Sequence, residues 1–559
     1  MHKATRVLLP SLLALTALAA AAQDAPVTAA QKTAAKEITP ELLRSHIRFL
    51  SSDLLEGRGP ATRGDQLAEA YIQSQMEGLG LKPGAPGGGW IQRVPLVGIK
   101  RTSSDPAVFK SGRGMLSGTL GEDFVAVSGV QKPESRIDGA EVVFVGYGIV
   151  APEYKWDDYK DADLKGKVLL VMNNDPEGSP AEPNLFAGKT RLWYGRWDYK
   201  YLMAAKKGAA GAIVIHTTPS AGYGWQVIQT SWAGEQFELP DDGAPRVTAR
   251  MWATDELAKK LVALGGKDLD ALRAAAESRT FKPVPLGVTM SLALTSEIGQ
   301  KESGNVIGVL PGSDPKRAGE AVIYTAHHDH LGIRVGAKPG VDAIYNGALD
   351  NASGVATILS VAGAFADLEK PPARSVYFAF VAGEEQGLLG SEYLAKHPPV
   401  SAGRIAVNIN VDGIGWFGRT KDVVLIGKGK SSLDADLEAV ATMQGRRVDG
   451  DQFPDRGTFY RSDQFNFARI GVPAAYLKKG TDVIGKPAGF GREQEELYEK
   501  NDYHQPSDEL RDSWDFSGAV EDARLAFWLG CRVADAPAMP RWNKGDEFEA
   551  ARLKAVGGQ

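Results

Sequence analysis

The stretch Ile323-Tyr-Thr-Ala-His-His-Asp-His-Leu-Gly332 holds three histidines and one aspartate in four consecutive positions, His327 to His330. Imidazole and carboxylate groups are the ligands that proteins use for zinc and related divalent metals. An apolar run over residues 321–326 leads directly into this cluster, which predicts a buried strand that delivers ligands at its end. We therefore expect a metal site whose remaining ligands come from other parts of the chain.

Acidic and histidine side chains recur at the ends of predicted strands downstream. In an α/β sheet, the site lies at the carboxyl ends of the strands. A single Glu-Glu or Asp-Asn pair is usually a solvated face or a turn, but recurrence at successive strand ends favours a shared site, because buried charges need partners. The groups are Asp350-Asn351 before a helix, Glu384-Glu385 after strand 375–382, Asp412 after strand 405–411, and His504 further on.

Two histidines and three carboxylates suffice for two metal ions that share one bridging carboxylate. Imidazole and carboxylate without thiolate favours Zn²⁺, with Co²⁺ or Mn²⁺ as alternatives. Two such ions, about 3.5–4 Å apart, activate a water and stabilise the charge that develops in hydrolysis. One further carboxylate must stay off the metals to take the proton of the water, and the adjacent Glu384 and Glu385 offer one group for each role.

The elements that must position these groups alternate between strand and helix from residue 305 onward. Such alternation predicts an α/β fold, with a mixed, mostly parallel sheet and helices on both faces, over residues 300–535. The predicted strands are 305–310, 321–326, 375–382, 405–411, 423–426 and 474–477, and the predicted helices are 354–368, 388–396 and 517–534.

The remainder of the chain divides into segments by its pattern of apolar residues and its composition. Residues 38–135 are predicted to form an N-terminal helical part of the same domain, and residues 136–290 a β-rich insert with one helix. Residues 221–245, with Trp225, Trp232 and Phe237 among glycines, are expected to form a long loop. Residues 23–37 are expected to be a disordered leader, and residues 536–559 a C-terminal tail.

The first 22 residues have the pattern of a secretory signal peptide. A basic start is followed by an apolar segment, Val7 to Ala22, that ends in alanines. The segment is shorter than the roughly 20 apolar residues that a membrane span needs, and no cysteine follows it to carry a lipid. We expect a periplasmic or secreted protein without stable membrane insertion after cleavage. Because Cys531 is the single cysteine, no internal disulfide is possible.

Composition is that of a soluble globular protein of two or three units, with 559 residues, 43% of them hydrophobic and 24% charged. The formal net charge is −5, and the sequence has no long basic run. Both observations argue against a nucleic-acid partner.

Five motifs, in this order, resemble the M28 family of zinc-dependent exopeptidases, which includes the bacterial leucyl-type aminopeptidases. The resemblance covers about residues 300–535 and implies a zinc-exopeptidase (phosphorylase/hydrolase-like) fold; residues 38–95 resemble the helical start of such chains. The middle segment resembles, more loosely, a protease-associated (PA) domain. The motifs are Ala326-His-His-Asp-His-Leu-Gly332, Gly347-Ala-Leu-Asp-Asn-Ala-Ser-Gly354, Ala382-Gly-Glu-Glu-Gln-Gly-Leu-Leu-Gly-Ser391, Asn410-Val-Asp-Gly-Ile-Gly415 and Tyr503-His-Gln-Pro-Ser-Asp508.

The resemblance implies a role for each motif residue. One zinc would be held by His327 and Asp412, the other by Glu385 and His504, and Asp350 would bridge the two. Glu384 would be the general base for a metal-bridging water, and Asp329 would orient the ring of His327. Tyr460 is expected, from the usual placement of a tyrosine in this family, to donate to the tetrahedral intermediate; the alternative is a packing tyrosine.

The expected activity is that of a di-zinc aminopeptidase acting on peptides. A carboxypeptidase is an alternative, since Arg456 and Arg461 could supply a cationic pocket for a terminal carboxylate. A glutaminyl cyclase of this fold works with one zinc, and a receptor-like member would lack ligands, so the full ligand set argues against both. The PA-like segment is expected to form a lid or specificity wall through Trp225–Phe237, with Gly485–Tyr498 as a second rim.

Overall fold

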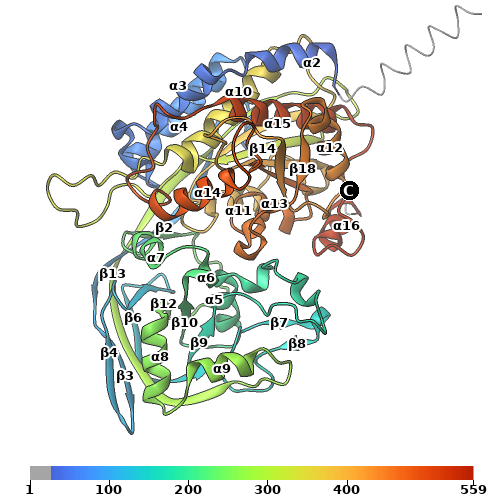
Figure 1. Ribbon diagram of the computed structural model, residues 1–559. Helices are drawn as coiled ribbons and strands as arrows, with labels where there is room; N and C mark the ends of the chain where they lie inside the picture. The colour runs from blue at the N-terminus through green and yellow to red at the C-terminus, as the bar shows by residue number, and fades with distance from the viewer. Residues whose placement is uncertain (1–26, 558–559) are drawn as a thin grey trace, which may run out of the picture.

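The computed structural model describes residues 27–557, which form two lobes stacked one above the other (Figure 1). The upper lobe contains residues 27–90 and 311–557, and the lower lobe contains residues 105–283. Two long strands, β2 (Ile91–Ser104) and β13 (Val284–Leu310), belong to both lobes. The predicted signal peptide, residues 1–22, lies outside the described residues.

The upper lobe is built on a mixed sheet whose four central strands are parallel. These strands are β15 (Ser375–Val381), β14 (Ala321–His327), β16 (Ile405–Val411) and β19 (Ala474–Lys479), in that spatial order. β13 adds antiparallel to β15 at one side. At the other side, β17 (Asp422–Ile426) adds antiparallel to β19, and β18 (Arg447–Asp449) adds parallel to β17.

Helices cover both faces of this sheet because side chains alternate along each strand. On β14, Val322, Tyr324 and Ala326 face the larger apolar core, whereas Ala321 and Ile323 face a smaller core on the opposite side. The prediction of an α/β fold with helices on both faces is confirmed. The larger core includes α3 (Pro40–Leu50), α4 (Arg63–Gly78), α10 (Ser353–Ala366), α12 (Leu433–Met443) and α15 (Ser517–Asp535), and the smaller one includes α11 (Leu389–Lys396) and α13 (Gln464–Arg469).

One apolar helical segment, Ala348–Ala366, is long and apolar enough by composition to cross a membrane, but 94% of it is buried inside the structure. It contains α10, which contacts α3, α15 and the strand β14. It is therefore the central core helix of the upper lobe.

The lower lobe has its own sheet and core. β6 (Glu134–Phe144), β9 (Val168–Met172), β10 (Gly211–His216) and β12 (Ala249–Thr254) run parallel, and β5 (Phe124–Ser128) adds antiparallel. The longer helices are α5 (Trp197–Lys206), α8 (Asp255–Leu264) and α9 (Leu269–Ala276), and the lobe also contains a hairpin of β3 (Ala107–Ser111) and β4 (Gly114–Gly118).

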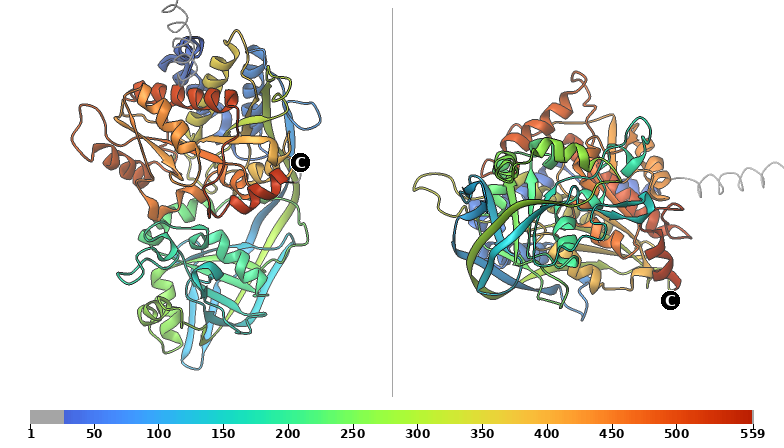
Figure 2. Two further views of the ribbon diagram at one scale, coloured as in Figure 1. Left: turned by 90° about the vertical axis from the view of Figure 1, so that its right-hand side faces the viewer. Right: turned by 90° about the horizontal axis from the view of Figure 1, so that it is seen from below.

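β13 connects the two lobes through continuous strand pairing. It pairs with β6 and β3 in the lower lobe and with β15 in the upper lobe, and β2 lies antiparallel to it from Leu294–Ser104 to Val306–Ile91. Figure 2 shows these long strands running along one side of the molecule from lobe to lobe. The sheet hydrogen bonds hold the lobes in one arrangement, with a cleft on the side away from the strands.

The expectation of a disordered leader is wrong for the residues that the structure describes. Residues 27–37 are ordered: Thr28 and Gln31 form a reciprocal capping box for α2 (Ala29–Ala34), and Gln31 Nε2 donates to Asp535 at 3.1 Å. The composition suggested disorder because it offers few large apolar residues, yet small alanines suffice to pack against the core. The C-terminal tail is also ordered, since Trp542 and Phe548 are buried and α16 (Glu549–Gly557) packs on the upper lobe.

Two expectations in the lower lobe are also wrong. The lobe begins before residue 136, because Ala107, Phe109 and Phe124 belong to its core. The helical part of the upper lobe correspondingly ends at α4, well before residue 135. The predicted long loop around Trp225 forms α7 (Trp225–Ser231) and the short strand β11 (Gln236–Glu238), which pairs with β2.

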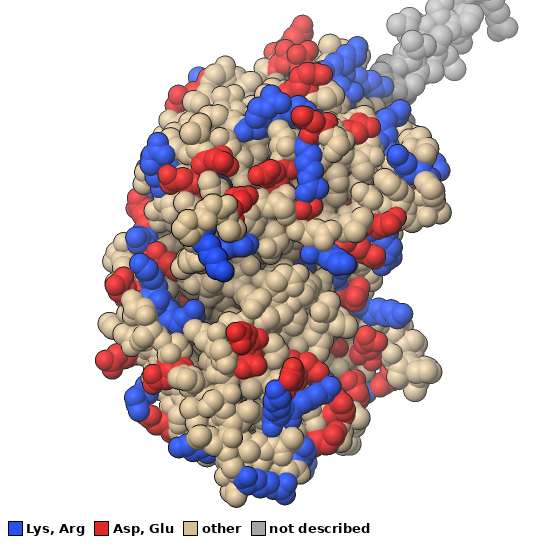
Figure 3. All heavy atoms as spheres, turned by 60° about the vertical axis from the view of Figure 1, so that its left-hand side comes forward, with Lys and Arg blue, Asp and Glu red and all other residues tan. Residues whose placement is uncertain are grey.

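The surface charges are mixed. The face in Figure 3 carries acidic and basic side chains next to one another, rather than a broad patch of one sign. This distribution agrees with the absence of a long basic run in the sequence.

Candidate metal centre

The five predicted metal ligands come together at the carboxyl edge of the central parallel strands. His327 is the last residue of β14, Glu385 follows β15 and Asp412 follows β16. Asp350 lies in the irregular turn that leads into α10, and His504 follows α14 (Phe490–Asn501). Three strand ends, the turn before α10 and the segment after α14 therefore bring together side chains up to 177 positions apart in the sequence.

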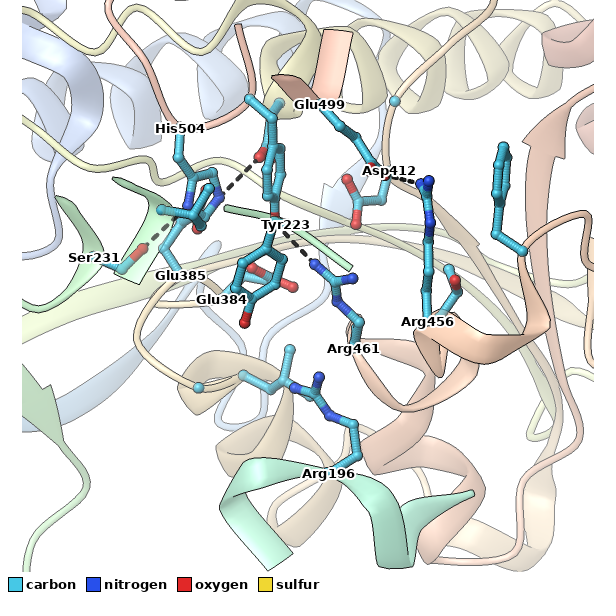
Figure 4. Close-up of a pocket in the computed structure, with 18 of the residues that line it drawn as sticks. Arg196, Tyr223, Ser231, Glu384, Glu385, Asp412, Arg456, Arg461, Glu499 and His504 are labelled. Atoms are coloured by element: carbon cyan, nitrogen blue, oxygen red, sulfur yellow. Dashed lines mark hydrogen bonds and ion pairs between the residues drawn. The ribbon is translucent and has the colours of Figure 1, made fainter. Parts of the chain in front are cut away.

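The ligands form two groups that meet at Asp350. Nε2 of His327 lies 3.3 Å from Asp350 Oδ1 and 3.7 Å from Asp412 Oδ1. Nε2 of His504 lies 3.3 Å from Asp350 Oδ2 and 3.0 Å from Glu385 Oε2 (Figure 4). Asp350 thus presents one carboxylate oxygen to each histidine, as a bridging ligand must.

The spacing of these atoms fits tetrahedral zinc. With bonds of about 2.0–2.1 Å, neighbouring ligand atoms around one zinc ion stand roughly 3.3 Å apart. The four separations within the two groups run from 3.0 to 3.7 Å. Moreover, Nε2 of both His327 and His504 is buried without a hydrogen-bond partner among the described residues. A buried nitrogen directed at carboxylates and otherwise unbonded is what a metal ligand requires.

The electrostatics of the cluster also favour bound cations. Burial acts to lower the pKa of His504, but the charges of Glu385 and Asp350 outweigh it and raise this pKa to about 10. Burial acts to raise the pKa of Glu385, yet the charges of His504 and His330 help to hold it at about 2. The site thus stabilises positive charge strongly enough to overcome burial, which is the electrostatic property that a site for divalent metal ions needs.

Glu384 occupies the position of a free carboxylate beside the ligands. One of its oxygens lies within 4.8 Å of ligand atoms of His327 and Asp412, and the side chain lines the cavity. Burial raises the pKa of Glu384 well above its usual range, with the charge of His327 acting in the opposite sense. A carboxylate with a raised pKa suits the role of proton acceptor.

Asp329 acts differently from the prediction. Its carboxylate Oδ1 lies 3.8 Å from Nδ1 of His327, whereas its main-chain carbonyl is nearer, at 3.2 Å. The carboxylate instead accepts the main-chain N–H groups of Glu384 at 3.1 Å and Glu385 at 3.3 Å. Asp329 therefore orients His327 through its main chain and fixes the Glu384–Glu385 turn through its side chain.

The prediction for Tyr460 is wrong. Its hydroxyl donates to Glu547 Oε1 at 2.7 Å, and the ring is buried in an apolar cluster that includes Phe459 and Phe465. Tyr460 is also absent from the residues that line the cavity. Glu547, the partner of the Tyr460 hydroxyl, lies in the C-terminal segment that was expected to be a tail. No sequence pattern in that segment indicated this contact.

Several supporting groups were not predicted as such. Asp508 accepts the N–H groups of Leu349 and Asp350, each at 3.0 Å, and so fixes the bridging residue. The position of Asp508 at the end of the last motif was the one sequence feature that could have indicated this role. Tyr476 donates to Asp412 at 3.1 Å, and His330, a residue that the sequence left without a fixed role, contacts Glu385 at 2.7 Å.

The metal centre opens into a cavity of about 260 Å³ between the lobes. The upper lobe contributes four of the five candidate ligands and Glu384, together with Glu495 and Tyr498 from the predicted second rim. The lower lobe contributes a wall from α7 and β11, and Phe237 on β11 donates its N–H to Gln386, next to Glu385, at 3.1 Å. Residues Trp225–Phe237 therefore face the cleft, as expected, although as a helix and a strand.

Comparisons with known proteins agree with this geometry. A curated "Probable zinc metalloprotease" of Pyrenophora teres f. teres is 49% identical over 69 residues, which are 12% of this chain and 14% of the relative. "Leucine aminopeptidase 1" of Trichophyton rubrum is 32% identical over 120 residues, 20% of this chain and 29% of the relative. This chain therefore spans less than a third of the length of either relative.

Among solved structures, the aminopeptidase from Aneurinibacillus sp. strain AM-1 superposes with a TM-score of 0.51 at 20% identity. The match covers 92% of this chain and 97% of that one, so the likeness in fold extends over both lobes. Residues 305–528 match the description "Peptidase family M28". This matching segment of the chain includes all five candidate ligands and Glu384.

Proposed function

We propose that this protein is a di-zinc metallo-aminopeptidase that releases N-terminal residues from peptides. The observation that carries the proposal is the position of Asp350, which offers one oxygen to His327 and the other to His504. Co²⁺ or Mn²⁺ could occupy the same oxygen and nitrogen donors. The printed names of the curated relatives, a zinc metalloprotease and a leucine aminopeptidase, support the same class.

Bound zinc ions supply Lewis acidity that lowers the pKa of a water and polarises the carbonyl of the scissile bond. The side chains of this protein perform the remaining steps. Glu384 accepts the proton of the attacking water and passes it to the amine that leaves. Asp329 and Asp508 hold the Glu384–Glu385 turn and Asp350 in place through four main-chain N–H groups.

The cavity supports action at a chain end. Its volume, about 260 Å³, lies below the roughly 300–1,000 Å³ of pockets for drug-sized ligands. The lower lobe walls the metal centre, so the cavity admits the end of a peptide more readily than the middle of a folded chain. In this proposal the lower lobe is an inserted PA domain that serves as a lid or specificity wall.

The site of action follows from the first residues of the chain. Residues 1–22 are, in this proposal, a signal peptide, which makes the enzyme periplasmic or secreted. Substrates would be peptides outside the cytoplasm, and no nucleic-acid partner is proposed.

A chelation experiment tests the proposal. The purified protein is assayed on a panel of aminoacyl-anilides before and after treatment with a chelator, and again after zinc is restored, with zinc content measured at each step. We expect two zinc ions per chain, loss of hydrolysis with the metal and recovery on its return. Hydrolysis that survives complete zinc removal, or turnover of N-blocked dipeptides in place of aminoacyl-anilides, would contradict an aminopeptidase.

A further inference from the structure

The cavity beside the metal centre is lined by six basic side chains, and four of them are paired with carboxylates. Arg196 lies 3.7 Å from Asp198 and Lys479 lies 2.9 Å from Glu495; Arg250 pairs with Glu238 and Arg456 with Glu499. Within residues 27–557, no carboxylate oxygen lies within 4.0 Å of a side-chain nitrogen of the remaining two, Arg461 and Lys478.

Arg461 is linked to the candidate ligand His504 through Tyr503. Its Nη2 donates to the hydroxyl of Tyr503 at 3.3 Å, and the ring of Tyr503 stacks on His504 with centroids 3.9 Å apart. On its other side, the guanidinium lies 5.4 Å from the centre of the Tyr223 ring, which comes from the lower lobe. Figure 4 shows the guanidinium directed into the space that Glu384 and His504 also face.

The donors of Arg461 are largely unused. A guanidinium carries five N–H donors in a planar fork, and the bond to Tyr503 is the hydrogen bond that its side chain makes among the described residues. Removing such a charge from water without a counter-charge is costly. The fork matches a carboxylate, which it binds through two parallel hydrogen bonds.

We propose that Arg461 binds a carboxylate carried by the residue that follows the scissile bond. In a dipeptide this group is the C-terminal carboxylate, and in a longer peptide it is the side chain of Asp or Glu at the same position. The preferred substrates are thus dipeptides and peptides with an acidic second residue. This inference rests on the proposed peptidase function and adds the class of substrate.

The proposal agrees with the asymmetry between Arg456 and Arg461. Both were predicted as possible elements of a cationic pocket, and both line the cavity. The charge of Arg456 is already paired with Glu499, and its guanidinium carbon lies 3.9 Å from the centre of the Phe453 ring. Arg461 is therefore the arginine of this pair that remains open to a substrate anion.

The first experiment compares four zinc-loaded reactions, on Leu-Ala, Leu-Ala-amide, Leu-Glu-amide and Leu-p-nitroanilide. Because charged hydrogen bonds contribute substantially, we expect Leu-Ala and Leu-Glu-amide to exceed Leu-Ala-amide in kcat/KM by about ten- to a hundred-fold. A preference for Leu-Ala alone identifies the terminal carboxylate as the source, and a preference for Leu-Glu-amide alone identifies the side chain. No preference for either would overturn the proposal.

The variant Arg461→Met keeps the apolar stem beside Tyr223 and removes the charge. It should abolish the preference while kcat/KM for Leu-Ala-amide and Leu-p-nitroanilide stays within about threefold, and Arg461→Lys should restore part of it. The matched control, Arg456→Met with Glu499→Gln, removes a paired cation from the same cavity and should keep the preference. Equal losses on all four substrates, or loss of the preference in Lys478→Met in place of Arg461→Met, would contradict the assignment.

A binding measurement separates this inference from the proposed function. Calorimetry with zinc-loaded Glu384→Gln should show Leu-Ala binding about tenfold or more tightly than Leu-Ala-amide, a difference that the added Arg461→Met removes. If the wild-type protein hydrolyses none of the four compounds but this difference is present, the peptidase proposal fails and the carboxylate site stands. If hydrolysis occurs and the difference is absent, the carboxylate site fails alone.

Discussion

The hydroxyl of Ser231, on α7 of the lower lobe, lies 3.2 Å from Nδ1 of His504 in the upper lobe. A neutral imidazole carries one N–H, so donation from Nδ1 to Ser231 leaves the lone pair of Nε2 facing Asp350 and Glu385. This is the tautomer that a metal ligand requires. A residue of the lower lobe therefore contacts a candidate ligand of the upper lobe and helps to set the tautomer of its imidazole.

Replacing Ser231 should weaken one of the two metal positions. Partners of ligating histidines typically contribute about 10- to 100-fold to metal affinity, so we expect Ser231→Ala to lower zinc affinity by that factor at the His504 position. Competition with a chromogenic chelator measures it. Thr230→Ala is the control, because the Thr230 hydroxyl is exposed and bonds within its own helix. Identical zinc affinity in both variants would show that Ser231 does not support the ligand.

The second prediction concerns the carboxylate of Asp329. Asp329→Ala leaves the buried N–H groups of Glu384 and Glu385 without their acceptor, so the turn that carries base and ligand should loosen. We expect kcat to fall by at least about tenfold, together with a loss of bound zinc, because Glu385 is one of the proposed ligands. Asp342→Ala, on the exposed part of a surface loop, should change neither. A kcat within about threefold of wild type would refute this role.

For Tyr460, the structure predicts a structural effect without a catalytic one. Tyr460→Phe removes the hydrogen bond to Glu547 and should lower the free energy of unfolding by about 1 kcal/mol. Urea unfolding gives that number, and steady-state kinetics should show kcat changed less than threefold. A hundredfold loss of kcat with unchanged stability would reinstate Tyr460 as a donor to the intermediate.

A fourth prediction concerns the pH dependence of stability. Asp158 in the lower lobe is 1% exposed, and burial raises its pKa to about 7, although the N–H groups of Ile149 and Trp156 donate to it. An aspartate in the unfolded chain has a pKa of about 3.9. Between these values the folded protein keeps a proton that the unfolded chain releases, so this group lowers stability as pH rises toward 7 and adds no further change above it.

Asp158→Asn should therefore flatten the change in unfolding free energy between pH 5 and pH 8, as measured by urea titration of the full chain. Asp163→Asn, a change at an exposed carboxylate of the same lobe, should leave that change as in the wild type. An unaltered pH dependence in Asp158→Asn would place the titrating group elsewhere.

The sequence could predict that the candidate ligands lie close together because strand ends carry their own signal. Apolar runs before His327, Glu385 and Asp412 indicated strands, and parallel strands bring their carboxyl ends together whatever lies between them. What the sequence did not reveal depends on contacts between distant segments. Ser231 meets His504 across 273 positions, and no local pattern distinguishes its hydroxyl from other exposed ones.

The errors have the same origin. The role of Tyr460 was inferred from the usual placement of a tyrosine in the family, but its hydroxyl bonds to Glu547, in a segment predicted to be a tail. The leader was predicted to be disordered because of its composition. Its helix is nevertheless stabilised by a capping box and by the hydrogen bond from Gln31 to Asp535, more than 500 positions away. Local composition describes the chain's own propensity, whereas these elements are held by tertiary packing.

The central claim is that Glu384 is the proton acceptor beside a two-zinc site that it does not itself form. Zinc content and kcat of Glu384→Gln, measured on the same sample, test it most directly. The account predicts two zinc ions per chain, as in the wild type, with kcat lower by several orders of magnitude. Glu384→Gln that keeps both zinc ions and retains substantial turnover would contradict it.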